Sequence, residues 1–355
     1  MKKILFRLSS LLLIVLLSFC ISSCSEKDIE TKDNEVFEIH TELQMKFLQN
    51  NYDLVSLCAK GKEELSKPNP VTIKWRDGGV GEYLFKLSED REFKDAREIK
   101  VNTNQVSIYN LKINTKYYWC VEYMKEDILT KTDTKTFTVA GATPRNLDID
   151  GITNARDLGG YSIGLDSYVK QGMIYRCSRF NENKTTTNLI TEKGIKEMRE
   201  VLNIKSELDV REKDESGNLT SSPLGNDINY YLVPMESGGN IILLNKDIIK
   251  DVFAVLGNED NYPIVIHCSI GTDRTGMICF LINALLGVSE ENLYRDYLFS
   301  NFGNIGKSRD SGIITTYIET VDVAEGDTLA LKTYNYLLSI GVSKTDLDTL
   351  IKVMK

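Results

Sequence analysis

The segment His267-Cys-Ser-Ile-Gly-Thr-Asp-Arg-Thr-Gly276 lies between two apolar runs, the short Ile264-Val-Ile266 and a longer one that continues through Leu286. This pattern predicts a buried strand, a loop and a helix that begins near Arg274. The loop's backbone N–H groups would converge in front of the helix's positive end, which makes an anion-binding site. Gly271 would permit a turn with unusual dihedral angles, and Gly276 would allow close helix packing. The predicted anion-binding residues are Ser269, Ile270, Gly271, Thr272, Asp273, Arg274 and Thr275.

Cys268 and Arg274 give this loop its predicted chemistry. The N–H groups and Arg274 would hold Cys268 as a thiolate, with a pKa below the free value of about 8.5. A thiolate beside a phosphate-shaped site can attack phosphorus, and water can then hydrolyse the cysteinyl-phosphate. The guanidinium of Arg274 can bind two phosphate oxygens at once, and the Thr275 hydroxyl can assist the departure of the sulfur. This chemistry requires no metal and no cofactor.

The segment resembles the Cys-x5-Arg signature of cysteine-dependent phosphatases, in the longer form His-Cys-x-x-Gly-x-x-Arg-Thr-Gly. Three further segments resemble the bacterial tyrosine/serine protein phosphatase family, namely Asn154-Ala-Arg-Asp-Leu-Gly-Gly-Tyr161, Ile174-Tyr-Arg-Cys-Ser178 and Asp209-Val-Arg211. Together with the loop they cover roughly residues 151–301. The resemblance implies a protein-tyrosine or dual-specificity phosphatase that acts through a cysteinyl-phosphate. It also implies that Arg156 and Asp157 support the active site. Without the resemblance, these two residues would be interpreted as a surface ion pair.

The sequence departs from this family at two positions. Thr272 stands where the family usually has Lys, and Cys177 stands where Ser is common. Losing the loop Lys weakens the positive field over the anion site. The departure therefore favours phosphotyrosine over phosphoinositides as the substrate.

Three carboxyl groups are candidates for the general acid that protonates the leaving oxygen. Asp273 lies inside the loop and matches the family's Asp at that position. Asp209 ends an upstream strand in the Asp-x-Arg element, and Glu236 follows a strand that ends at Val-Pro-Met235, about 32 residues before Cys268. Each of the three also has a structural interpretation: Asp273 as a loop brace, Asp209 as a partner of Arg211, and Glu236 as a solvated side chain.

Three other residues near the loop have predicted roles. His267 is expected to orient the loop through backbone contacts. Cys177 either packs in the sheet or approaches Cys268 as a resolving thiol under oxidation. Cys279 lies in the apolar run Met277-Ile-Cys-Phe-Leu-Ile282 and is expected to pack in the core.

The segment 145–355 alternates predicted strands with helices. Residues 189–202 and 241–256 have helical spacing, whereas Ile204-Lys-Ser-Glu-Leu-Asp-Val210 and Asn229-Tyr-Tyr-Leu-Val-Pro-Met235 suit strands. Such alternation predicts an α/β domain with a mostly parallel sheet. The small-residue segment Ala140-Gly-Ala-Thr-Pro144 is the expected domain boundary.

The segment 36–140 has short alternating runs typical of an antiparallel β-sandwich. Trp75, the Leu111-Lys-Ile-Asn-Thr-Lys-Tyr117 segment and Trp119 resemble a fibronectin type III domain, whose tyrosine corner the second element matches. That resemblance implies a fold and no function. Cys58 and Cys120 are expected to be buried thiols, with a disulfide as the alternative.

Residues 1–23 have the pattern of a signal peptide. Lys2, Lys3 and Arg7 precede an apolar run, and Ile21-Ser-Ser-Cys24 resembles a bacterial lipobox. The resemblance implies a lipoprotein whose acylated Cys24 holds it on a lipid bilayer of the bacterial cell envelope, periplasmic or at the cell surface. Residues 24–35 are polar and acidic, as expected of a solvated tether.

The composition limits which partners and metal sites are expected. The net charge of −8 makes nucleic acid an unexpected partner, and only two His in 355 residues argue against a multi-histidine metal site. The expected partner is a phosphorylated protein or a small phosphate ester. A phytase-like or phosphoinositide phosphatase remains an alternative, as does a non-catalytic surface protein that binds phosphorylated ligands.

Overall fold

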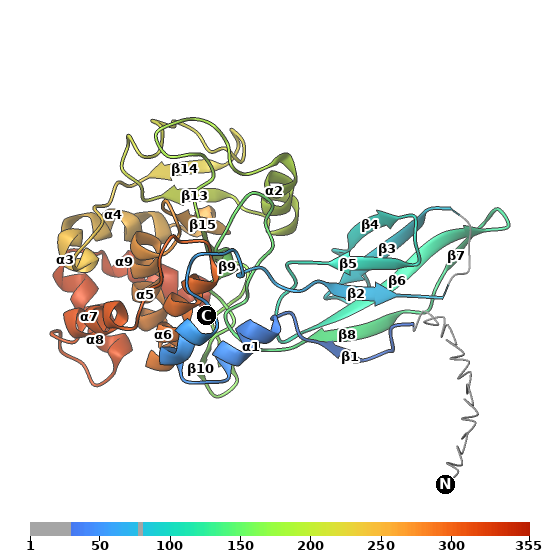
Figure 1. Ribbon diagram of the computed structural model, residues 1–355, viewed down its shortest axis with the longest axis horizontal. Coiled ribbons are helices and arrows are strands. Elements are labelled where there is room, and N and C mark those ends of the chain that lie inside the picture. Colours follow the sequence, from blue (N-terminus) through green and yellow to red (C-terminus); the bar gives the residue numbers. More distant parts are fainter. Residues whose placement is uncertain (1–29, 77–80) are drawn as a thin grey trace, which may run out of the picture.

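The computed structural model describes residues 30–76 and 81–355. The predicted signal peptide, Cys24 and half of the predicted tether (residues 24–29) lie outside these residues. Within the described ranges, no helix is both long and apolar enough to cross a membrane. The chain forms two halves, an α/β half that holds the C-terminus and an elongated all-β half (Figure 1).

The α/β half is built on a five-stranded sheet in the order β14-β13-β15-β12-β9. Its strands are β9 (Arg156–Asp157), β12 (Ile174–Cys177), β13 (Ser206–Asp209), β14 (Asn229–Leu232) and β15 (Ile264–His267). All neighbours pair in parallel except β9, which is antiparallel to β12. Every residue of β12, β13 and β15 is buried, as expected of parallel strands covered on both faces. The predicted mostly parallel α/β sheet is confirmed.

Helices cover both faces of this sheet. They are α2 (Glu192–Lys196), α3 (Ile241–Leu244), α4 (Lys246–Leu256), α5 (Asp273–Leu286), α6 (Glu290–Phe299), α7 (Gly312–Val321), α8 (Leu329–Ser339) and α9 (Lys344–Met354). On one face, α5 packs against β12 and β15 and is itself covered by α6, α7, α8 and α9. On the other face, Tyr175 and Val265 share a core with Met198 and Leu202, just after α2.

The predicted helix over residues 241–256 is interrupted at Asn245, between α3 and α4. The Asn245 side chain donates to the Ile241 and Glu236 carbonyls (2.9 and 3.0 Å) and accepts from the Glu236 N–H (2.8 Å). A side chain that bonds nearby backbone in this way competes with helical hydrogen bonds. The interruption therefore fixes the segment that carries Glu236.

The all-β half has a six-stranded sheet with the main order β1-β8-β6-β3-β4, and β7 pairs with β6; a second sheet consists of β2 and β5. The strands are β1 (Glu35–Phe37), β2 (Val71–Lys74), β3 (Tyr83–Ser88), β4 (Arg97–Val101), β5 (Gln105–Ile108), β6 (Thr115–Lys125), β7 (Ile128–Lys131) and β8 (Lys135–Val139). The two sheets share one apolar core around Trp75, Phe85 and Trp119. The Tyr117 hydroxyl accepts a hydrogen bond from the Lys112 N–H (2.8 Å), the kind of contact expected of a tyrosine corner. Membership of the fibronectin type III family stays a prediction.

One segment within 36–140 packs outside this core. Helix α1 (Glu42–Leu48) and the 3-10 helix η1 (Tyr52–Leu57) lie on the α/β half. Phe47 contacts the Phe302 ring (centroids 5.6 Å apart), and Tyr52 stacks on Tyr294 (4.5 Å). The expected assignment of all of 36–140 to the sandwich therefore needs correction, because these apolar side chains complete the other core. Cys58 lies beside that core, Cys120 lies in β6, and both are free thiols.

Arg145 joins the two halves. Its guanidinium pairs with Asp157 (2.6 Å) in the α/β half and donates to the Asn110 and Leu111 carbonyls (2.6 and 2.9 Å) in the all-β half. Burial opposes its charge, but Asp157, together with Tyr175 and Tyr117, outweighs burial and raises the pKa of Arg145. A cleft of about 1220 Å³ opens at this junction.

Candidate active site

The loop between β15 and α5 has the backbone predicted for it. Gly271 has a φ of +66°, and an added Cβ would lie 2.2 Å from the Cys177 carbonyl oxygen. A Cβ on Gly276 would come within 3.1 Å of the Tyr297 ring and 3.2 Å of the Arg176 guanidinium. Both predictions about these glycines are confirmed: Gly271 has left-handed backbone and no room for a Cβ, and Gly276 lies in tight contact with the neighbouring Tyr297 and Arg176.

Cys268 lies at the start of this loop, with 2% of its surface exposed. Burial raises the pKa of a thiol, but the opposing effects are larger here. The charge of Arg274, the Thr275 hydroxyl and the backbone N–H groups of Thr275 and Ile270 bring the pKa of Cys268 below its ordinary value. The Thr275 hydroxyl is buried and committed to no other group. Neighbouring charges and dipoles therefore favour the ionised form of the sulfur, with little help from water.

Arg274 is held by Glu215, a residue that the sequence reading missed. The Arg274 Nη1 and Nη2 groups pair with the two Glu215 carboxylate oxygens at 2.6 and 3.0 Å. Nη1 also donates to the Met235 carbonyl (3.3 Å), whereas Nε donates to no described residue. The Nε edge is therefore the part of the guanidinium that stays available to an anion.

Glu215 also accepts a hydrogen bond from the Ser269 hydroxyl (2.8 Å). Burial raises the pKa of Glu215, but Arg274 and Ser269 outweigh it and bring the pKa to about 2. Glu215 is thus a permanent carboxylate that orients both Arg274 and the loop. The only sequence signal for it was its place in the charged run Arg211-Glu-Lys-Asp-Glu215, after the Asp-x-Arg element.

A buried polar network holds the other side of the loop. The Asn154 side chain donates to the Ile270 and Gly271 carbonyls (3.1 and 3.2 Å) and to the hydroxyl of Thr272 (3.2 Å). Arg176 donates to the Gly271 carbonyl at 2.7 Å. Thr272, at the position where the family usually has Lys, is thus a buried brace that presents no charge to an anion.

Asp296 of α6 anchors this network. It pairs with Arg176 (2.5 Å) and with Arg156 (2.9 Å), and both guanidinium groups are fully buried. Arg156 also donates to the Asn154 side-chain oxygen at 2.6 Å. Arg156 therefore braces the loop through Asn154, the kind of support that the family resemblance implied.

Asp157 acts elsewhere and does not pair with Arg156. Its carboxylate binds Arg145 (2.6 Å) and accepts from the Gly159 and Gly172 N–H groups (2.8 and 2.7 Å). Successive residues of a strand point to opposite faces, so Asp157 faces the junction of the two halves when Arg156 faces α6. The expectation that Asp157 braces the active site is corrected accordingly.

The three candidate acids differ in how their carboxylates are engaged. Asp273 pairs with Arg309 through two hydrogen bonds (2.8 and 2.7 Å), and its pKa is lowered because Arg309 and Tyr297 outweigh burial. Asp209 is fully buried and pairs with Arg211 at 2.6 Å. Its pKa is lowered because His267 and Arg211 outweigh burial.

Glu236 has an exposed side chain that bonds to no described residue. Its backbone, held by Asn245, directly follows the Met235 carbonyl that contacts Arg274.

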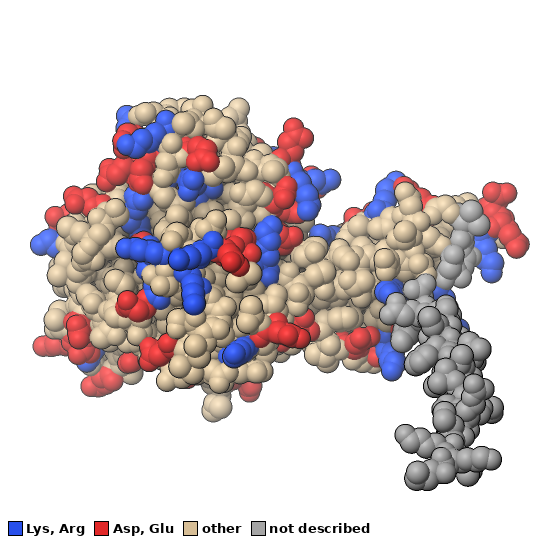
Figure 2. Space-filling model, in the orientation of Figure 1, with Lys and Arg blue, Asp and Glu red and all other residues tan. Residues whose placement is uncertain are grey.

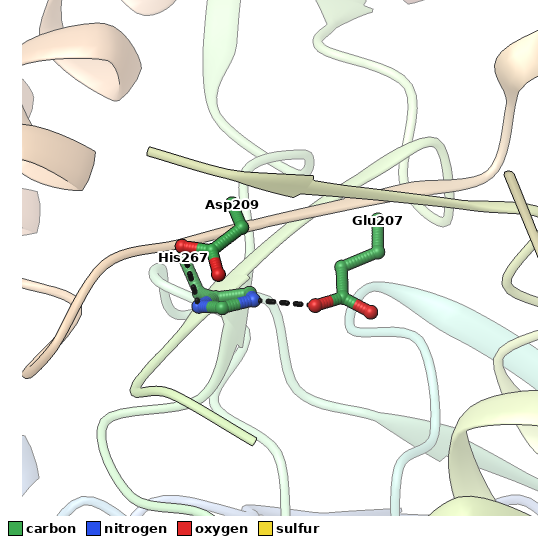
Figure 3. A group of neighbouring side chains, drawn as sticks. All are labelled: Glu207, Asp209 and His267. Atoms are coloured by element: carbon green, nitrogen blue, oxygen red, sulfur yellow. Dashed lines mark hydrogen bonds and ion pairs between the residues drawn. The ribbon is translucent and has the colours of Figure 1, made fainter. Parts of the chain in front are cut away.

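Behind Cys268, His267 lies between two carboxylates (Figure 3). Its Nε2 is 2.8 Å from Glu207 and its Nδ1 is 3.8 Å from Asp209, and all three side chains are fully buried. Burial lowers the pKa of His267, but the two carboxylates outweigh burial and raise it. The predicted backbone contact is also present, with Nδ1 at 3.4 Å from the Cys268 carbonyl oxygen.

These three residues offer ligand atoms within 4.8 Å of one another, which is close enough to surround a metal ion. The Asp209 carboxylate is already bound by Arg211, and Glu207 accepts from His267 and from the Ser222 hydroxyl. The raised pKa of His267 favours its protonated form, which cannot ligate a metal. The group therefore fits a chain of buried ion pairs better than a metal centre.

The two remaining thiols near the loop are deeply buried. Burial raises the pKa of Cys177 well above its ordinary value, and that of Cys279 to about 11. Cys279 packs within α5, as expected. Cys177 pairs in register with His267, one strand from Cys268, and its role as a resolving thiol stays a prediction.

Comparison with known proteins places this site in a family. The sequence model of the tyrosine phosphatase family matches residues 147–339. The core catalytic domain of the PP-IP phosphatase SIW14 from S. cerevisiae, solved in complex with citrate, is 26% identical over 41% of this chain and 80% of its own length (TM-score 0.31). A second structure, of the Siw14 catalytic core, is 19% identical over 55% of this chain and 98% of its own length (TM-score 0.34). No curated protein matches the chain. The matched residues span more than half of the chain and contain the whole Cys268 loop, so the chain belongs to the tyrosine phosphatase family.

Proposed function

We propose that this chain hydrolyses phosphate monoesters through a cysteinyl-phosphate on Cys268, with phosphotyrosine in proteins as its substrate. One observation carries the proposal: a thiol of lowered pKa lies beside an arginine that a carboxylate holds in place and whose Nε edge is open. A protein that only binds phosphate would need no nucleophile at this position. Thr272 presents no charge to a bound anion, which favours phosphotyrosine over a phosphoinositide as the substrate.

In the proposed first step, the loop N–H groups and the Arg274 Nε edge bind the phosphate oxygens. The Cys268 sulfur attacks phosphorus while the P–O ester bond breaks, and the leaving oxygen takes a proton. In the second step a water oxygen attacks phosphorus and the S–P bond breaks. Inorganic phosphate leaves, and the Thr275 hydroxyl and Arg274 stabilise the regenerated thiolate.

We assign the proton transfers to Glu236. Asp273 and Asp209 are each held ionised by an arginine, and a general acid must be able to carry a proton. Glu236 has no such partner and directly follows the residue whose carbonyl contacts Arg274. It would donate its proton to the leaving oxygen and recover one from the attacking water.

We also propose that the protein is held at the bacterial cell envelope through an acylated Cys24. The lipobox-like Ile21-Ser-Ser-Cys24 supports this location.

Turnover of p-nitrophenyl phosphate tests the mechanism. Cys268→Ser and Arg274→Ala are each expected to lower kcat/KM by about a thousandfold or more, because each removes a group that acts in the transition state. The wild-type rate is expected to stay unchanged in EDTA. Persistent turnover in Cys268→Ser, or loss of wild-type turnover in EDTA, would reject the mechanism.

The leaving group tests Glu236. Glu236→Gln is expected to lower kcat on phenyl phosphate by about a hundredfold. The loss on p-nitrophenyl phosphate should be much smaller, because p-nitrophenolate departs without a proton. Glu200→Gln, an exposed glutamate at the junction cleft, serves as the control and is expected to change neither rate. Equal effects of Glu236→Gln on both substrates, or none, would show that another group is the acid.

A further inference from the structure

The cleft between the two halves is separate from the catalytic loop. Met173 and Pro263 line it, and they directly precede β12 and β15. The catalytic loop instead follows β15 at its other end, so one strand of four residues, roughly 13 Å, separates the two. At about 1220 Å³ the cleft is large enough for a small organic molecule.

The charge of this cleft differs from that of the whole chain. Seven Lys and Arg side chains line it against five Asp and Glu side chains, whereas the chain has a net charge of −8. Most of the acids are already paired with lysines: Glu89 with Lys112 (2.9 Å), Glu98 with Lys86 (3.2 Å), Glu197 with Lys193 (3.6 Å) and Glu200 with Lys196 (3.6 Å). Lys and Arg side chains are visible at the junction beside acidic ones (Figure 2). Two of the cations, Lys100 and Arg145, pair with acids outside the lining, Glu82 (3.1 Å) and Asp157 (2.6 Å). Among the described residues, two lining cations, Arg97 and Lys170, therefore remain without a carboxylate partner, against one unpaired lining acid, Asp95.

Arg97 of β4 is a partly buried cation of the cleft that lacks a carboxylate partner among the described residues. Its Nη1 donates to the Tyr109 carbonyl (3.1 Å), and among the described residues it has no carboxylate within ion-pair distance. Nε and Nη2 donate to no described residue, and Arg97 lines the cleft. Burial lowers the pKa of Arg97, and the more distant Glu197 offsets this only in part. A half-buried guanidinium with two open donor groups is a fork suited to a phosphate or carboxylate.

Other cations line the same cleft. Lys170 is exposed and pairs with no described carboxylate. Lys193 and Lys196 line the cleft from helix α2, on the side of the α/β half. Each of them already has a glutamate 3.6 Å away. An anion at Arg97 would thus have cations from both halves around it.

We propose that the cleft is a second anion site, in which Arg97 binds an oxyanion group of a small phosphorylated or carboxylated molecule. The ligand bridges the all-β half and the α/β half. This site is independent of the proposed catalytic activity, because Arg97 touches no residue of the catalytic loop.

Calorimetric titration of the whole protein with pyrophosphate tests the proposal. Wild type is expected to bind two equivalents, one at the catalytic loop and one at the cleft. Arg274→Ala should still bind pyrophosphate in the cleft, and Arg97→Ala should still bind pyrophosphate at the catalytic loop. Arg97→Ala is expected to weaken the cleft equivalent by roughly tenfold to a hundredfold, the range for a charge-assisted hydrogen-bonded pair. Arg97→Lys, which keeps the charge and loses the fork, should fall between the two.

Arg91→Ala is the matched control, since Arg91 is an exposed arginine of the same sheet region that does not line the cleft. It should leave both equivalents unchanged. Turnover of p-nitrophenyl phosphate by Arg97→Ala should equal that of wild type, which also shows that the variant is folded. The proposal is overturned if Arg97→Ala retains both equivalents or if wild type binds only an equivalent that Arg274→Ala removes. Failure of the catalytic proposal would appear instead as absent turnover with the cleft equivalent intact.

Discussion

The two sheets of this protein bury opposite kinds of side chain. The core of the all-β half is apolar, with Trp75, Phe85 and Trp119 stacked at its centre. The sheet of the α/β half also buries three charged or titratable side chains on its central strands, Arg176, Asp209 and His267. Buried charge is costly unless it is paired, so its concentration around one loop marks where the fold serves chemistry as well as stability.

Removing Asp296 should have the largest effect. Asp296→Asn leaves the buried Arg156 and Arg176 without their counter-charge, which typically costs about 3–5 kcal/mol of unfolding free energy. Turnover should fall as well, because Arg176 holds the Gly271 carbonyl. Urea unfolding followed by far-UV circular dichroism and by residual turnover measures both effects. Asp310→Asn, an exposed aspartate in the loop before α7, is the control and should change neither.

A cavity in the all-β core should have a smaller and confined effect. Val121 is fully buried in β6, and Val121→Ala should lower the stability of that half by about 2 kcal/mol. Both tryptophans of the chain, Trp75 and Trp119, lie in this core, so their fluorescence follows its unfolding alone. The fluorescence midpoint in urea should fall in Val121→Ala while kcat/KM stays at the wild-type value. A parallel loss of turnover would mean that the two halves unfold as one unit.

The parts of the site that were predictable from the sequence are those made by neighbouring residues. The strand, loop and helix around Cys268 and the special roles of Gly271 and Gly276 follow from local spacing. Glu215 lies 59 positions from Arg274, and no local pattern connects the two. Separations of this kind are set by the packed sheet and become visible only in three dimensions.

Long sequence separation also explains why the whole segment 36–140 was wrongly assigned to the sandwich. By sequence, helix α1 falls within the segment 36–140 that was assigned to the sandwich, but Phe47 packs on Phe299 and Phe302, about 250 positions away. Asp157 was misjudged for a related reason. Its sequence neighbour Arg156 suggested one shared role, whereas strand alternation sends the two side chains to different partners.

The smallest expected effect concerns how stability depends on pH in the α/β half. The pKa of His267 is raised in the folded state, so the folded protein holds a proton that the unfolded chain releases. This contribution to stability is fully present below the ordinary histidine pKa of about 6.5 and is lost as the pH rises through the folded value. Asp209, Arg211, Glu207 and the Phe180 ring surround His267, and Glu207 supplies its shortest contact.

Glu207→Gln removes the negative charge next to His267. The free energy of unfolding should therefore fall less steeply above pH 6.5 in this variant than in wild type. Glu192→Gln, at an exposed glutamate in the first turn of α2, is the matched control and should leave the slope unchanged. Urea midpoints between pH 5.5 and 9 measure both, and an unaltered slope in Glu207→Gln would show that Asp209 alone sustains the protonated ring.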